Sequence, residues 1–196
     1  MSERIAALDA DAPDIVRAWR GVDDGRLLEV RRQVRRGAGE GSAERIVGQL
    51  GAVAAALAAV VGALPERAFL LPGGEGDWNV AQALGHTADS RAGLAMAGAL
   101  AASGRWPSDA AAVVQGIPGA PDAGREQLLR RLATSQRIVE RAARSIAGHE
   151  TDPCPLEHPT VGHLRCGEWL LFSGVHDLMH LAQLEDLERR IAAGDA

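Results

Sequence analysis

The fold is decided by residues 165–193, RCGEWLLFSGVHDLMHLAQLEDLERRIAA. Large side chains recur in this segment at steps of three or four, at Trp169, Phe172, His176, His180 and Leu187. Because residues at that spacing lie on one face of an α-helix, the segment predicts a long helix with a single buried stripe. Two histidines lie on that stripe, so polar rings are expected among apolar neighbours.

Three further stretches have helical periodicity, and segments rich in Gly, Pro and Asp separate them. We expect helices over residues 43–64, 79–102 and 121–147. Asn79 and Gln82 have the spacing of a capping box, which marks the start of the second of these helices. Strands are not expected, because no run alternates in hydrophobicity for more than a few positions. The simplest architecture is an all-α four-helix bundle, either up-and-down or with a crossover.

The first 40 residues are organised differently. Two shorter helical pieces are expected there, near residues 13–20 and 26–36, and a glycine-rich break follows them. We therefore divide the chain into a short helical N-terminal extension, residues 1–40, and a four-helix bundle domain, residues 41–196.

Composition limits the class of protein. The chain has 196 residues, 46% of them hydrophobic, and 26 acidic against 21 basic residues give a formal charge of −5. These values are typical of one globular domain that needs no disulfide framework. Every basic residue is arginine, which excludes lysine Schiff-base chemistry. The acidic balance argues against a nucleic-acid partner, and the local basic cluster at residues 31–36 is expected to be a solvated helix face.

Three features predict a cytoplasmic protein without a membrane partner. The N-terminal residues have no apolar segment after a basic start, so neither a signal peptide nor a transit peptide is expected. The longest weakly polar stretch, residues 50–64, is short of the roughly 20 apolar residues that a membrane span needs. Cys154 and Cys166 have no CxxC spacing, so in a cytosolic protein we expect free thiols.

The chain has six histidines, and the pair His176 and His180 is the most informative. The i, i+4 spacing sets their Cβ atoms about 6 Å apart on one helix face, so both imidazoles are able to bind one ion. A third ligand has to come from another helix, and His86 is best placed because its helix should face the last one. The alternative is a set of core histidines satisfied by Ser, Thr or carboxylate partners.

Residues 176–180, HDLMH, also resemble the HExxH helix of metalloproteases. Asp177 is one methylene shorter than the Glu of that motif, and no downstream third-ligand pattern follows, so a protease is disfavoured. Asp177 lies about 100° around the helix from His176, which is typical of a solvated or interface residue rather than a general base.

Two segments resemble a known family. Residues 158–183, HPTVGHLRCGEWLLFSGVHDLMHLAQ, and residues 78–86, WNVAQALGH, resemble the DinB-like (YfiT-like) superfamily of metal-dependent enzymes. The resemblance covers about residues 43–193. It implies a four-helix bundle in which a histidine of the second helix and an HxxxH pair of the fourth bind a divalent metal. The matching positions of this chain are His86, His176 and His180.

The resemblance also implies a chemistry. The ion is expected to be Zn²⁺, with Ni, Fe or Mn as alternatives. Characterised relatives use bacillithiol or mycothiol as thiol co-substrates in transferase or isomerase reactions, and others are hydrolases. We therefore expect an enzyme whose metal activates water or a low-molecular-weight thiol toward a small-molecule substrate. A homodimer is expected as well, because relatives commonly pair and the helix at residues 43–64 is rich in alanine.

Three residues are candidates to support the metal ligands. Asp89 lies one turn after the first histidine of the set and Gln183 lies three residues after the last, so each is able to orient an imidazole. An ordinary surface or interhelix contact is the alternative for both. His158, in the loop before the last helix, is able to reach the mouth of the site or to stabilise its own turn.

The competing function is a non-enzymatic metal-binding or ligand-binding bundle. A fourth protein ligand, for instance Cys154, His158 or Asp89, would close the site and favour that function. An open coordination position facing a cleft would favour catalysis. A DNA-binding role, which the family name suggests, is disfavoured by the charge balance.

Overall fold

The computed structural model describes residues 3–73 and 76–193; the outer ends of the two predicted domains, residues 1–2 and 194–196, lie outside them. The helices are α1 (Glu3–Ala7), α2 (Pro13–Asp23), α3 (Leu27–Gly37), α4 (Ala43–Ala63), the 3₁₀ helix η1 (Glu66–Leu70), α5 (Val80–Ala102), α6 (Arg125–Ile146) and α7 (Cys166–Ala193). A hairpin of β1 (Pro153–His158) and β2 (Gly162–Arg165) precedes α7. The predicted all-α class is confirmed.

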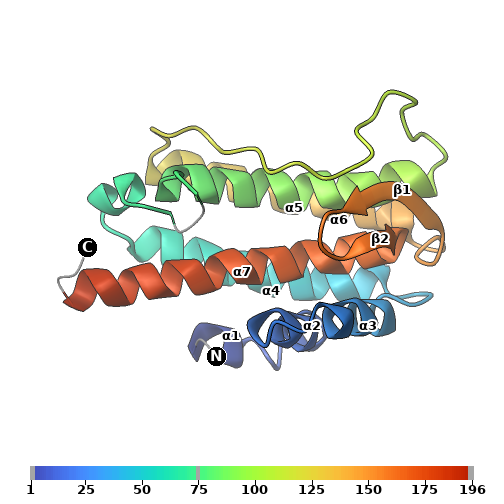
Figure 1. The fold of residues 1–196 in the computed structure, drawn as a ribbon, viewed down its shortest axis with the longest axis horizontal. Coiled ribbons are helices and arrows are strands. Elements are labelled where there is room, and N and C mark those ends of the chain that lie inside the picture. Colours follow the sequence, from blue (N-terminus) through green and yellow to red (C-terminus); the bar gives the residue numbers. More distant parts are fainter. Residues whose placement is uncertain (1–2, 74–75, 194–196) are drawn as a thin grey trace.

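Helices α4, α5, α6 and α7 form a four-helix bundle (Figure 1). Both α4 and α5 pack against α6 and α7, so α4 and α5 occupy opposite corners. The interior is aliphatic, with buried side chains at Leu50, Leu57, Leu84, Leu128, Leu170 and Leu178. Because α5 and α7 are neighbours, inward-facing side chains of these two helices are able to meet.

Helices α2 and α3 cover the α4–α7 side of the bundle (Figure 1). Both lie where the sequence predicts helices, and their buried residues join the same hydrophobic core as the bundle. Gly174 of α7 permits the close approach of α2, because a Cβ there would lie 2.5 Å from Cδ1 of Ile15. The arginines of α3 are exposed, as expected for a solvated face. The domain boundary at residue 40 stays a prediction.

The start of α5 agrees with its predicted cap. The Asn79 side chain accepts a hydrogen bond from the Gln82 backbone N–H at 2.9 Å, and the Gln82 side chain accepts one from the Asn79 N–H at 3.1 Å. Asn79 also donates from Nδ2 to the Pro121 carbonyl at 2.8 Å. The segment at Pro121 is thereby held as a connection, and α6 begins at Arg125, four residues later than predicted.

The hairpin departs from the sequence prediction. Strand β1 alternates between exposed and buried positions, with Cys154 and Leu156 facing inward, and pairs antiparallel with β2. The strands span six and four residues, and β1 contains two prolines, so the alternation is too short to identify. Gly162 closes the turn at a φ of 71°, a conformation that favours glycine. His158 therefore ends a strand rather than lying in a loop.

Helix α4 is long and apolar enough to cross a membrane by length and composition. The sequence prediction counted residues 50–64 as too short to span a membrane. That prediction was wrong about the length of the helix, which begins at Ala43. The core helix of a soluble protein meets the same criterion, and α4 packs against α6 and α7 with Leu50, Val53 and Leu57 buried.

Candidate metal centre

Three histidines from two helices meet inside the bundle. His86 comes from the second turn of α5, and His176 and His180 come from adjacent turns of α7. One ring nitrogen from each lies within 4.8 Å of the other two, and the two Nε2 atoms of His86 and His176 are 3.2 Å apart. The ring centroids are separated by 4.7 to 5.4 Å. The structure therefore brings together the three predicted ligands.

The surroundings keep His176 and His180 neutral. His86 is 6% exposed and His180 is 5% exposed. Burial, together with the neighbouring His86, lowers the pKa of His180 to about 4. Burial also lowers the pKa of His176 well below its usual value, and His180 and His86 act in the same direction. Since a neutral imidazole has one nitrogen lone pair, the rings of His176 and His180 are in the state that binds metal.

Two oxygens fix the orientation of the rings. Nδ1 of His86 lies 2.9 Å from the Ile117 carbonyl oxygen, and Nδ1 of His180 lies 2.8 Å from Oε1 of Gln183. Because these oxygens only accept, each Nδ1 carries the proton and each Nε2 carries the lone pair. Orienting partners of this kind are typical of metal-bound histidines.

The connection between α5 and α6 positions the Ile117 carbonyl. It runs along the outside of α5 (Figure 1), pairs with β1 at Val113 and Glu157, and donates from the Gly119 N–H to the Gln82 carbonyl. A Cβ at Gly119 would lie 2.6 Å from Cα of Gly85, so glycine is required for this approach. Sequence reasoning missed Ile117, because a backbone carbonyl leaves no side-chain pattern.

The family comparison agrees with this geometry. A model of the DinB superfamily matches residues 49–184, more than half of the chain, and the matched segment contains all three histidines. The chain belongs to the DinB superfamily. No curated protein and no solved structure matches it. Within this DinB-superfamily chain, α1, α2 and α3 lie outside the matched residues.

Aromatic rings border the DinB-superfamily centre on two sides. The ring of Trp78 packs on that of His86, with centroids 5.0 Å apart. His158 packs edge to face on Phe172, with centroids 4.9 Å apart, and Phe172 lies one turn before His176 on α7. Nδ1 of His158 accepts hydrogen bonds within its own turn, so the turn-stabilising role that was left open is present. Burial lowers the pKa of His158.

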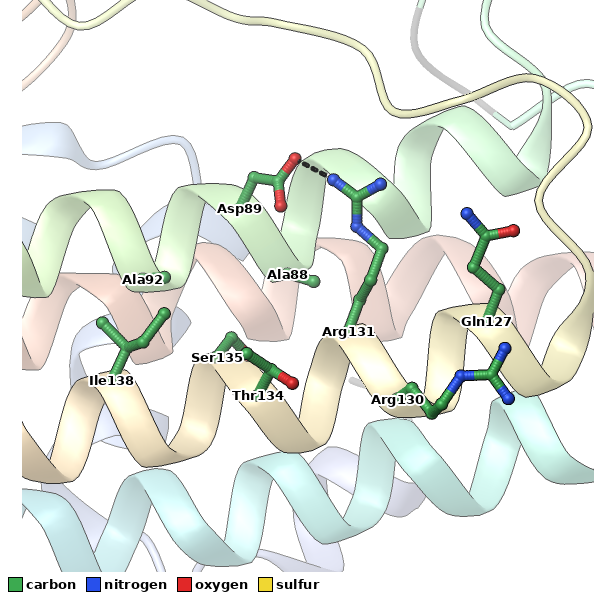
Figure 2. A pocket seen from close by; sticks show the side chains of 9 residues that line it. All are labelled: Ala88, Asp89, Ala92, Gln127, Arg130, Arg131, Thr134, Ser135 and Ile138. Carbon is green, nitrogen blue, oxygen red and sulfur yellow. Dashed lines mark hydrogen bonds and ion pairs between the residues drawn. The ribbon is translucent and has the colours of Figure 1, made fainter.

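Asp89 is turned away from the centre. Its carboxylate pairs with Arg131 of α6 in a surface groove between α5 and α6, which Ala92, Ser135 and Ile138 also line (Figure 2). Within the described residues it has no hydrogen bond to a histidine. The interhelix contact, which was the alternative to an orienting role, is therefore what the structure contains.

A buried ion pair lies beside the centre, and sequence reasoning missed it. Nε of Arg91 is 3.3 Å from Oδ2 of Asp177, and both side chains are fully buried. Arg91 also donates from Nη2 to the Leu50 carbonyl at 3.1 Å and to Oε1 of Gln136 at 2.8 Å, so the pair joins all four bundle helices. Asp177 is thus at an interface and not solvated. Burial raises the pKa of Asp177 to about 7, and Arg91 opposes the rise.

Cys154 and Cys166 are free thiols, as predicted, and both are buried. Burial raises the pKa of Cys166 to about 12 and also raises that of Cys154. The Sγ atoms lie against backbone carbonyls, at 3.7 Å for Cys154 and 3.9 Å for Cys166. Among the described residues neither belongs to the metal-ligating group, so the cysteines contribute packing beneath the hairpin.

Proposed function

We propose that this protein is a metal-dependent enzyme in which His86, His176 and His180 hold a divalent cation. The observation that carries the proposal is the convergence of three imidazoles, with ring nitrogens within 4.8 Å of one another, in the interior of the bundle. Nε2 of His86 and Nε2 of His176 lie within hydrogen-bond distance, but the buried Nδ1 of His176 has no hydrogen-bond partner among the described residues. A cation that accepts the lone pairs of the three rings fits this donor set.

The number of ligands supports catalysis over a structural role. Catalytic zinc sites have three protein ligands, whereas structural sites have four, and the residues described here supply three. When bound, such an ion lowers the pKa of a coordinated water or thiol and polarises a substrate oxygen. We therefore propose that the protein acts on a small molecule with water or with a low-molecular-weight thiol such as bacillithiol or mycothiol.

The protein's own residues prepare the site. The Ile117 carbonyl and Gln183 hold the Nδ1 protons of two rings, which keeps the lone pairs on Nε2. The ring of Trp78 packs against that of His86, with centroids 5.0 Å apart. An all-imidazole donor set suits zinc, nickel and iron, whereas manganese favours oxygen ligands, so we propose Zn²⁺ first and Mn²⁺ last.

The first experiment is elemental analysis of protein purified without a histidine tag. We expect about one equivalent of metal in the wild type and none in His176→Ala, because two ligands rarely hold an ion. His163→Ala is the matched control, since that histidine is exposed and lies outside the cluster. Full metal content in His176→Ala would defeat the assignment.

The second experiment separates the two chemistries. Cobalt-loaded protein is titrated with low-molecular-weight thiols, and ester hydrolysis and thiol transfer to an electrophile are then assayed. A thiolate-to-cobalt absorption band together with thiol-dependent turnover supports a transferase. Metal-dependent hydrolysis without thiol supports a hydrolase. Stoichiometric metal with neither activity supports the non-enzymatic binding bundle.

A further inference from the structure

His158 has a defined place beside the histidine cluster. The alternation along β1 turns Cys154, Leu156 and His158 to the same side of the strand, toward α7. The ring meets Phe172 at 4.9 Å and lies 6.3 Å from the ring of Trp169. Phe172 lies one turn before His176 on α7, so His158 packs against the stretch of helix that carries the cluster.

The turn of the hairpin selects one tautomer of His158. The backbone N–H groups of Thr160 and Val161 both point at its Nδ1, at 3.1 and 3.4 Å. A backbone N–H only donates, so Nδ1 must carry a lone pair. The neutral ring then has its proton on Nε2.

This tautomer is opposite to that of the metal-ligand candidates. His86 and His180 have protonated Nδ1 atoms, whereas His158 has a protonated Nε2. In the part of the chain that the structure describes, Nε2 of His158 forms no hydrogen bond, and the ring is half-buried. An N–H has no lone pair for a cation, which argues against His158 as a fourth ligand. It suits an oxygen acceptor instead.

We propose that His158 donates a hydrogen bond from Nε2 to an oxygen of the substrate at the histidine centre, and so positions a carboxylate or carbonyl group. The inference rests on the proposed function, since the substrate is the one that the metal centre would act on. It names an oxygen-bearing substrate as the class that this site takes.

Two variants distinguish the loss of the Nε2 donor of His158 from the loss of its Nδ1 acceptor in the turn. In His158→Asn the side-chain oxygen takes the place of Nδ1 and still accepts from Thr160 and Val161, but nothing remains at the Nε2 position. In His158→Gln the amide nitrogen takes the place of Nε2, and the acceptor at the turn is lost. The first variant therefore removes the proposed donor and retains the turn.

The main experiment titrates cobalt-loaded protein with acetate, and with imidazole as a ligand that needs no donor, by visible absorption. We expect His158→Asn to weaken acetate binding roughly tenfold, the lower end for a hydrogen bond to a charged group. Imidazole affinity, metal content and thermal unfolding should match the wild type, and His158→Gln should recover part of the acetate affinity. Unchanged acetate affinity in His158→Asn overturns the inference and leaves the metal centre standing.

A second measurement needs no metal. Long-range ¹H–¹⁵N correlation spectra of the metal-free protein report which nitrogen of His158 carries the proton. A proton on Nε2 supports the inference, and a proton on Nδ1 overturns it. Loss of metal from His158→Asn would make the residue a ligand and also overturns it. A wild-type protein that binds no metal overturns the proposed function and this inference together.

Discussion

Two groups of buried polar side chains lie next to each other on α5 and α7, and they differ in charge. Arg91 and Asp177 carry opposite charges and pair at 3.3 Å. His86, His176 and His180 are three like bases whose nitrogens face one another. The charges of the first group balance each other within the fold, whereas we propose that the second group binds a cation. Two consecutive residues of α7, His176 and Asp177, thus belong to a candidate metal site and to an ion pair.

Removal of Arg91 should have the largest effect on stability. Arg91→Ala leaves the carboxylate of Asp177 buried without its partner, and such a break costs about 3–5 kcal/mol of unfolding free energy. His176→Ala leaves no unpaired charge, so its cost in metal-free protein should be smaller. Urea unfolding of the metal-free variants measures both.

The control is the double variant Arg91→Leu with Asp177→Leu. Replacing both charges by apolar side chains of similar volume should recover most of the loss, because neither charge then remains alone. If Arg91→Ala were as mild as His176→Ala, the contrast between a buried ion pair and a cluster of uncharged bases would be lost.

The two groups should respond to pH in opposite directions. The pKa of His180 is about 4 in the fold, against 6.5 for an ordinary histidine. The unfolded chain therefore binds more protons between these values, and the stability present above pH 6.5 is lost as pH falls toward 4. The pKa of Asp177 is raised to about 7 in the fold, so the folded chain binds more protons than the unfolded chain below that pH. The stability contributed by its protonated form is therefore lost as pH rises through the same window.

Urea unfolding of metal-free wild type and His180→Gln across this window isolates the histidine. The difference in unfolding free energy between the two proteins should fall by at most about 1.4 kcal/mol per pH unit as the solution is acidified. A difference that stays flat from pH 6.5 to 4 would falsify the neutral, buried state of this ring. His163→Gln, at an exposed position outside the cluster, is the matched control.

Metal addition should stabilise only the protein with an intact cluster. Zn²⁺ at a free concentration one hundred times its dissociation constant should raise the unfolding free energy of the wild type by about 2.7 kcal/mol. His176→Ala should gain nothing, whereas Arg91→Leu with Asp177→Leu should gain as much as the wild type. Thermal unfolding with and without Zn²⁺ makes the comparison. Equal gains in all three proteins would locate the ion elsewhere.

Most of the fold could be predicted because its elements are long and local in sequence. The helical stripe of α7 and the capping box of Asn79 and Gln82 are complete within a few turns. The hairpin was missed because its strands are short and β1 contains prolines. The start of α6 was placed too early because a contact of Asn79 holds Pro121 in the connection, and that contact joins positions 42 residues apart.

The ligand candidates could be predicted, but their surroundings could not. The spacing of His176 and His180 is local, and His86 followed from the expected packing of its helix against the last one, which the family resemblance supported. The Arg91–Asp177 pair depends on the relative register of α5 and α7, which no local pattern records. One clue was available, because Arg91 is the one basic residue of an otherwise alanine-rich and glycine-rich helix.

A comparison of Gln183 with Asp89 tests which polar residues orient the histidines of the cluster, and it has the smallest expected effect. Both lie three residues after a histidine, but only Gln183 contacts one, through Oε1 at 2.8 Å from Nδ1 of His180, whereas Asp89 pairs with Arg131. Gln183→Ala should weaken metal affinity about 10–100-fold, the range for losing a residue that orients a ligand. Asp89→Ala should leave it unchanged. Competition with a chromophoric chelator measures both affinities. Equal losses would mean that the hydrogen bond to Nδ1 does not orient the ring, and that the cluster binds metal through its three imidazoles alone.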